Sequence, residues 1–96
     1  MPGRVEGRVT RISPDGNLVT DIACESLRDA PRDERLTITC DEHMTVGLFG
    51  ADHTEPPMTF LAILAESGFL ELCMVGDNAS LMLGIRPGEK VQIKWS

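Results

Sequence analysis

The alternation of apolar and polar residues along the chain predicts a series of short β-strands. Neighbouring side chains of a strand point to opposite faces, so a period of two marks a half-buried strand. The segments with this period are 4–12, 18–23, 36–40, 44–49, 70–74 and 91–95. The apolar run 58–65 fits a helix or a buried strand by its period, and its brevity and the turn after it favour a strand. The pattern therefore predicts six to seven short strands.

Turn residues and one short helix connect these strands. Ser13-Pro14-Asp15-Gly16-Asn17 combines proline with residues that tolerate positive φ, which predicts a chain reversal. Asp77-Asn78 has the residue types of a helix N-cap, so a short helix is expected near residues 78–83. The predicted fold class is mainly β, a small antiparallel β-barrel or sandwich with this one helix. A chain of 96 residues has the length of one domain, and residues 1–96 are expected to form it.

Composition excludes several classes of function. The formal net charge of −6 produces no field that would attract nucleic acid or an anionic membrane. The three cysteines form no CxxC pair, which is typical of reduced thiols rather than of a secreted disulfide framework. No apolar run is long enough for a membrane span, and the N-terminus lacks the pattern of a signal peptide. A cytoplasmic location is expected.

Few motifs in the chain point to chemistry. Cys40, His43, His53 and Cys73 are a weak candidate for a zinc site because their spacing has no paired-ligand signature. No nucleophile elbow and no glycine-rich phosphate loop is present, so no catalytic residue, metal or required cofactor is predicted. Segments 15–17 and 76–80 combine turn glycines with polar residues at predicted strand ends. They would suit the edge of a planar heterocycle or an anion, or serve only as turn and helix cap.

At these segments the chain resembles the C-terminal domain of the S-adenosyl-L-methionine hydroxide adenosyltransferase family, which includes the fluorinases and chlorinases. The family opens this domain with G-x-V-x-x-I-D-x-F-G-N-[LV]-x-T-N-I, and residues 7–22 read GRVTRISPDGNLVTDI. Its S-G-[YF]-L-E-[IL] motif corresponds to residues 67–72, SGFLEL, and its closing G-S-A-A-x-x-L-G stretch to residues 77–84. The likeness covers nearly the whole chain.

The resemblance implies a small β-barrel that holds mainly the adenine of its ligand against the N-terminal domain of a neighbouring subunit. It implies that Asn17 and the Asn78-Ala79 segment face the purine edge, and that Phe49 and Glu66-Ser67 line the remainder of the site. The implied ligand is S-adenosyl-L-methionine or adenosine.

Three departures from the family bear on function. Ser13 replaces the acidic residue expected to meet the ligand's amino group, and Asp15 replaces a phenylalanine. The length of the chain also leaves no room for the family's N-terminal domain, which carries the ribose-binding carboxylate and the site of attack by water or halide.

These observations leave three expectations for function. The first is a stand-alone, non-catalytic module that binds an adenine nucleoside or S-adenosyl-L-methionine weakly, or serves in assembly as a homo-oligomer or with a protein partner. The second is the C-terminal half of a split adenosyltransferase. The third is a purely structural interaction domain, in which the run 58–65 is interface as readily as core.

Overall fold

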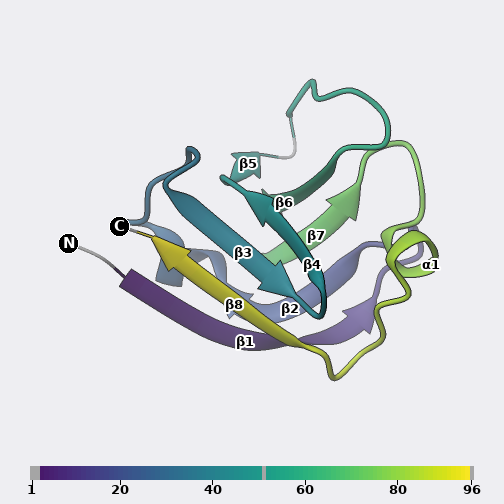
Figure 1. Ribbon diagram of the computed structural model, residues 1–96, viewed down its shortest axis with the longest axis horizontal. Helices are drawn as coiled ribbons and strands as arrows, with labels where there is room; N and C mark the ends of the chain where they lie inside the picture. Colours follow the sequence, from purple (N-terminus) through teal and green to yellow (C-terminus); the bar gives the residue numbers. More distant parts are fainter. Residues whose placement is uncertain (1–2, 51, 96) are drawn as a thin grey trace.

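The computed structural model describes residues 3–50 and 52–95, which form one mainly β domain (Figure 1). A single-turn 3-10 helix, η1 (Cys24–Leu27), follows the second strand, and the helix α1 (Ala79–Leu83) precedes the last one. The strands are β1 (Gly3–Ile12), β2 (Leu18–Ala23), β3 (Leu36–Cys40), β4 (His43–Val46), β5 (Phe49–Gly50), β6 (Phe60–Leu64), β7 (Phe69–Met74) and β8 (Lys90–Trp95).

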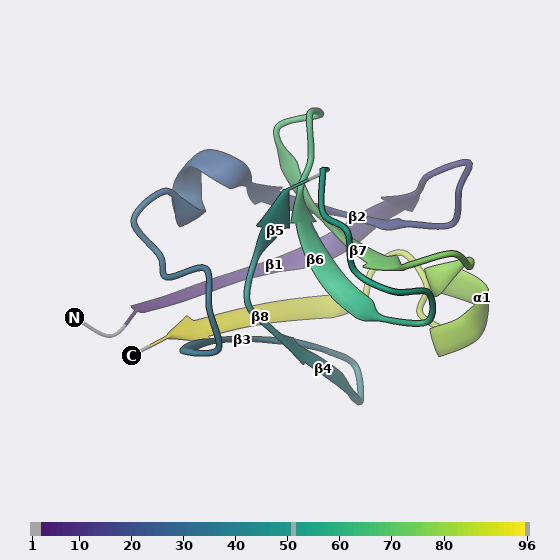
Figure 2. The same ribbon diagram turned by 90° about the horizontal axis from the view of Figure 1, so that it is seen from above.

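All of these strands belong to one sheet in the order β4-β3-β8-β1-β2-β7-β6-β5. Every pair is antiparallel except β5 with β6, which is parallel. The sheet curls so that β3 and β4 lie opposite β6 and β7 (Figures 1 and 2). The Thr45 Oγ1 hydroxyl on β4 donates a hydrogen bond of 2.8 Å to the Phe60 carbonyl on β6, which joins the two sides of the curl. The predicted small barrel-like fold is confirmed.

The predicted segments match the observed elements closely, with one correction. Residues 44–49 were expected to form one strand, but they divide into β4 and β5 at Gly47. Gly47 has a φ of +80°, and a Cβ there would lie 3.0 Å from the Arg32 carbonyl oxygen. The chain therefore turns under the loop that holds Arg32, and β5 joins the far edge of the sheet beside β6. The described residues therefore form eight strands rather than six or seven, and two of them, β5 and β6, pair in parallel.

The side chains of β7 alternate between the two faces of the sheet. Leu70 and Leu72 are fully buried in the main core, whereas Glu71 between them is only half-buried. The main core is completed by side chains from the other strands, η1 and α1, among them Leu18, Leu27, Leu36, Ile38, Ala79, Ile85 and Ile93. On the opposite face, Glu71 pairs in register with Val19 on β2 and with Ile63 on β6. This second face, which we call the outer face, carries the polar side chains described below.

The centre of the apolar run 58–65 is interior. Leu61 and Ala62 are 0% exposed and Ile63 is 9% exposed, whereas Met58 at the start of the run is 56% exposed. The sequence left open whether this run is core or interface, and Leu61, Ala62 and Ile63 are buried within the domain.

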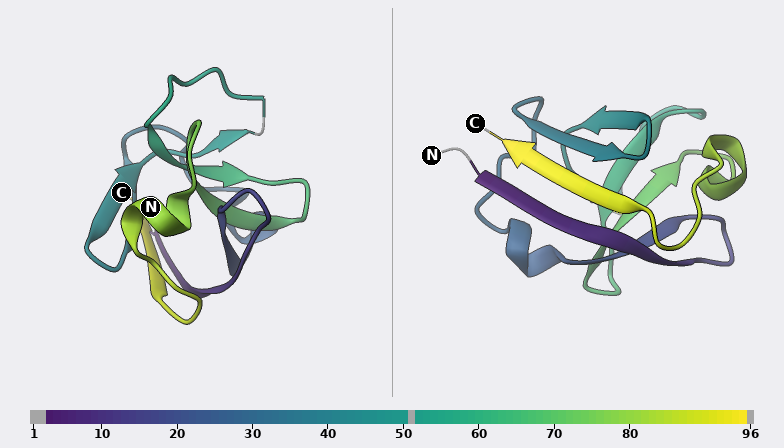
Figure 3. Two further views of the ribbon diagram at one scale, coloured as in Figure 1. Left: turned by 90° about the vertical axis from the view of Figure 1, so that its right-hand side faces the viewer. Right: turned by 60° about the horizontal axis from the view of Figure 1, so that its bottom comes forward.

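The two ends of the barrel differ in what they contain. Gly3 and Trp95 are partners in the β1–β8 ladder, so the first and last described residues lie together. Helix α1 and the β1–β2 turn lie at the opposite end of the long axis (Figures 1 and 3). The described residues include no helix long and apolar enough to cross a membrane.

Candidate functional site

The two segments singled out in the sequence, the turn 13–17 and the start of α1, are in direct contact. The Ser80 backbone N–H donates to the Gly16 carbonyl at 3.0 Å. Gly16 has a φ of +88°, and a Cβ at this position would lie 2.1 Å from Asn78 Cγ. Only glycine leaves the space that the Asn78 side chain occupies. Figure 3 shows this turn and α1 side by side at the end of the barrel.

Asn78 is the N-cap of α1, as predicted. Its Oδ1 accepts a hydrogen bond of 3.0 Å from the Leu81 backbone N–H, one of the donors that a helix N-terminus leaves unpaired. Gly84 ends the helix in the left-handed conformation with a φ of +69°. The Asn78 side chain thus has a structural role that needs no ligand.

Ser13 closes the turn from the other side. Its Oγ accepts a hydrogen bond of 3.0 Å from the Asn17 backbone N–H. Its backbone N–H donates to the Asn17 carbonyl at 2.9 Å, and its carbonyl accepts from Gly16 N–H at the same distance. Ser13 therefore supplies a side-chain hydrogen-bond acceptor that shapes the turn.

An open hollow of about 440 Å³ lies at this end of the barrel, within the usual size range of small-molecule sites. Residues from both segments line it together with the end of β7: Asp15, Asn17, Cys73, Met74, Gly76 and Asp77. The two aspartates give the hollow negative charge, and Cys73 supplies apolar surface.

A polar network connects Asn17 to the β6–β7 turn across the outer face. Asn17 Nδ2 donates to Glu71 Oε1 at 3.4 Å, and Ser67 Oγ donates to Glu71 Oε2 at 3.2 Å. Glu71 had no role in the sequence analysis, although it lies in the SGFLEL motif. The alternation of β7 could have revealed it, since the period of two places Glu71 and Cys73 on the same face.

The remaining predicted site residues occupy different positions. Phe49 on β5 pairs in register with Ile63, and its ring meets that of His53 edge-on at 6.4 Å between centroids. Glu66 and Ser67 are exposed, and Ser67 lines a separate hollow of about 250 Å³ with Phe69. Ala79 is fully buried in the main core. Of the predicted residues, only Asn17 lines the larger hollow. The Asn78 side chain does not line it but packs against Gly16, the residue before Asn17.

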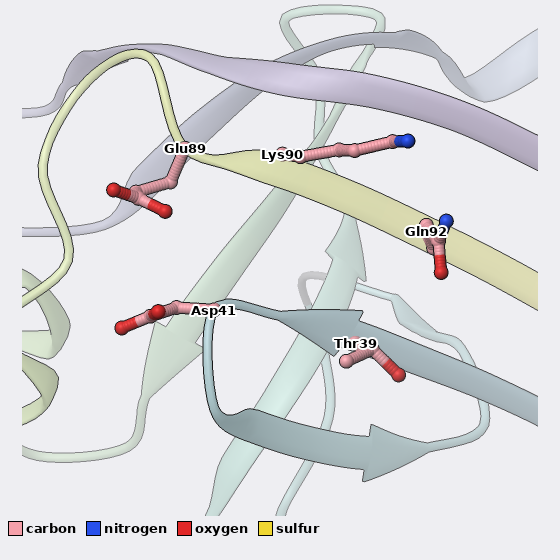
Figure 4. A pocket seen from close by; sticks show the side chains of 5 residues that line it. All are labelled: Thr39, Asp41, Glu89, Lys90 and Gln92. Atoms are coloured by element: carbon pink, nitrogen blue, oxygen red, sulfur yellow. The ribbon is translucent and has the colours of Figure 1, made fainter.

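A different hollow, of about 260 Å³, lies between β3 and β8 and is lined by Thr39, Asp41, Glu89, Lys90 and Gln92 (Figure 4). The carboxylates of Asp41 and Glu89 point to the same side, whereas Lys90 extends along β8 away from them. Lys90 Nζ forms an ion pair of 3.0 Å with Glu6. This hollow contains none of the predicted site residues, so it provides positions for control substitutions.

All three thiols are held in the protonated form. Burial raises the pKa of Cys40 to about 11, with a smaller contribution from the charges of Glu89 and Asp41. Burial also raises the pKa of Cys24 and of Cys73, and the charge of Glu71 adds to both effects. A reactive cysteine requires a lowered pKa, so none of these thiols has the properties of a nucleophile. No three His, Cys, Asp or Glu side chains within residues 3–50 and 52–95 are grouped to hold a metal ion.

These features define a small curled β-barrel domain with polar side chains and an open hollow at one end. The sequence profile of the S-adenosyl-L-methionine hydroxide adenosyltransferase C-terminal domain matches residues 8–92, and the chain belongs to this family. Comparison with curated proteins finds no match.

Two solved structures have the same fold. One is an uncharacterized conserved protein from Thermotoga maritima, with a TM-score of 0.75 and 21% identity over 93% of this chain. The other is a conserved hypothetical protein from Thermus thermophilus, with a TM-score of 0.70 and 21% identity over 92% of this chain. The chain spans 34% of the length of each.

Proposed function

We propose that this barrel is a non-catalytic binding module for an adenine nucleoside or S-adenosyl-L-methionine, held in the hollow beside Asn17. The observation that carries the proposal is the meeting of the two family motifs at that hollow. Asn17 and Asp15 come from the first motif, and Asp77 comes from the closing one. They combine hydrogen-bonding groups with the apolar surface of Cys73, which together suit a purine.

The charge of the hollow narrows the class of ligand. Asp15 and Asp77 are both carboxylates on its lining, and Glu71 lies behind Asn17. Negative charge attracts a cation and repels phosphate. S-Adenosyl-L-methionine carries a sulfonium and a net positive charge, and adenosine is neutral, so both are compatible. Nucleotides with phosphate groups are disfavoured.

The experiment is a 1H–15N NMR titration with adenosine and with S-adenosyl-L-methionine. We expect shift changes around residues 15–17 and 73–77, and their loss in Asn17→Ala. The matched control is Gln92→Ala, which removes an amide from the other hollow and should leave the titration unchanged. Absence of any shift in these two segments at millimolar ligand would refute the proposal.

We propose as a second candidate that the barrel supplies one wall of an adenosyltransferase site that another domain completes. The supporting observation is that the chain spans 34% of the length of the two solved relatives. In such a complex, water attacks C5′ of S-adenosyl-L-methionine and loses a proton to solvent, while the carbon–sulfur bond breaks with its electron pair on sulfur to release adenosine and methionine. The test is to mix the barrel with a polypeptide carrying the family's N-terminal domain and to measure adenosine release. Equal release with and without the barrel would exclude this role.

A further inference from the structure

Glu71 lies between two residues that the sequence assigned to the ligand site. Its place in the β-ladder, opposite Val19 and Ile63, directs its side chain to the outer face. Each carboxylate oxygen has its own donor, Oε1 from Asn17 Nδ2 and Oε2 from Ser67 Oγ. Ser67 in turn accepts a hydrogen bond of 3.4 Å from the Phe69 backbone N–H, so the carboxylate is held from the β6–β7 turn.

This carboxylate determines which way the Asn17 amide faces. An ionised carboxylate only accepts hydrogen bonds, so the nitrogen of the amide must face Glu71 and not the oxygen. The backbone of Asn17 is held independently by both of its hydrogen bonds to Ser13. The amide oxygen is then the group that Asn17 offers to the hollow it lines. No hydrogen bond found among the described residues uses that oxygen.

We infer that Glu71 is a positioning residue that makes Asn17 a hydrogen-bond acceptor in the hollow and thereby selects ligands with an exocyclic amino group. This inference rests on the proposed function and specifies its ligand class. A 6-aminopurine donates a proton to the Asn17 oxygen. A 6-oxopurine has an oxygen at the same position. This oxygen and the Asn17 amide oxygen are both acceptors, so no hydrogen bond forms and the two oxygens repel each other.

The first test needs no ligand. Glu71→Gln keeps the size of the side chain but can offer either end of its amide, so Asn17 is no longer held in one orientation. We expect the side-chain amide resonances of Asn17 to move in a 1H–15N spectrum of this variant. Glu89→Gln is the matched control, because it makes the same charge change in the other hollow, away from Asn17, and is expected to leave them in place. Unchanged Asn17 resonances in Glu71→Gln would overturn the inference.

The second test compares the affinities for adenosine and inosine. We expect the unaltered barrel and Glu89→Gln to prefer adenosine by about tenfold, and Glu71→Gln to reduce this ratio to about one. Glu71→Asp keeps the charge but is one methylene shorter, so it withdraws from Asn17 and should reduce the ratio as well. If Glu71→Gln does not fold, Glu71→Asp is the variant on which the comparison of adenosine with inosine is made.

The two tests separate this inference from the proposed function. A retained preference for adenosine in folded Glu71→Gln and Glu71→Asp would overturn the inference and leave nucleoside binding intact. Failure of every protein to bind either nucleoside would overturn the proposed function and the selectivity with it. The Asn17 resonances would still decide, in that event, whether Glu71 positions the amide.

Discussion

Gly16→Ala tests the contact on which the end of the barrel depends. An alanine at a φ of +88° is strained by about 1 to 2 kcal/mol. Its Cβ would also lie 2.1 to 2.4 Å from the end of the Asn78 side chain, which must move away. Moving Asn78 removes the cap on the Leu81 N–H, which costs about 1 kcal/mol. We therefore expect the free energy of unfolding to fall by about 2 to 3 kcal/mol.

Chemical and thermal denaturation followed by circular dichroism measure this effect, with an expected decrease of roughly 10 to 25 °C in the melting temperature. Gly68→Ala is the matched control, because Gly68 has a φ of +90° and a Cβ there meets nothing within 4 Å. Gly68→Ala should lose only the stability that corresponds to backbone strain at positive φ, about 1 to 2 kcal/mol. The excess loss at Gly16 should disappear in an Asn78→Gly background, where the clash is gone. Equal losses in Gly16→Ala and Gly68→Ala would refute the reasoning.

Further predictions concern the core, the closure of the barrel and the buried thiol. Leu61→Asp should prevent folding, because an unpaired buried carboxylate costs several kcal/mol, whereas Val46→Asp, at a position 45% exposed, should leave the circular dichroism spectrum and melting temperature nearly unchanged. Thr45→Val removes the hydrogen bond that joins β4 to β6 and should cost about 1 kcal/mol in urea denaturation; an unchanged midpoint would show that this bond does not stabilise the closure. Cys40, with a folded pKa of about 11, keeps its proton between pH 9 and 11 while the unfolded thiol loses it. Stability should therefore fall over that range, and the fall should be smaller in Cys40→Ala than in the unaltered chain when urea midpoints are compared.

Local pattern was sufficient to predict most elements of this fold. The strands 18–23 and 36–40 have the predicted bounds, and the helix 79–83 lies within the predicted range of 78–83, because alternation and capping residues act over a few neighbours. The division of 44–49 was not predictable in this way. It depends on Gly47 passing beneath the Arg32 carbonyl, a contact between segments separated by a loop.

The candidate site shows the same limit. The turn 13–17 and the N-cap at Asn78 were each recognisable from their residue types, but their contact depends on a hydrogen bond from Ser80 to Gly16 across most of the chain. The link from Asn17 to Glu71 depends on the pairing of β2 with β7. Pairing between strands that are distant in sequence is determined by the whole barrel, so one sequence does not display it.

The position of the chain ends bears on how a second domain would reach the hollow. Gly3 and Trp95 pair at one end, whereas the β1–β2 turn and α1 lie at the other end of a domain 35 Å long (Figure 1). A domain joined ahead of Gly3 in the same polypeptide begins far from the hollow and has to extend along the barrel to cover it. A domain of another polypeptide approaches that end directly. For the second candidate function that we propose, this geometry favours a completing domain supplied by another polypeptide, and a tag fused at either terminus leaves the hollow accessible to it.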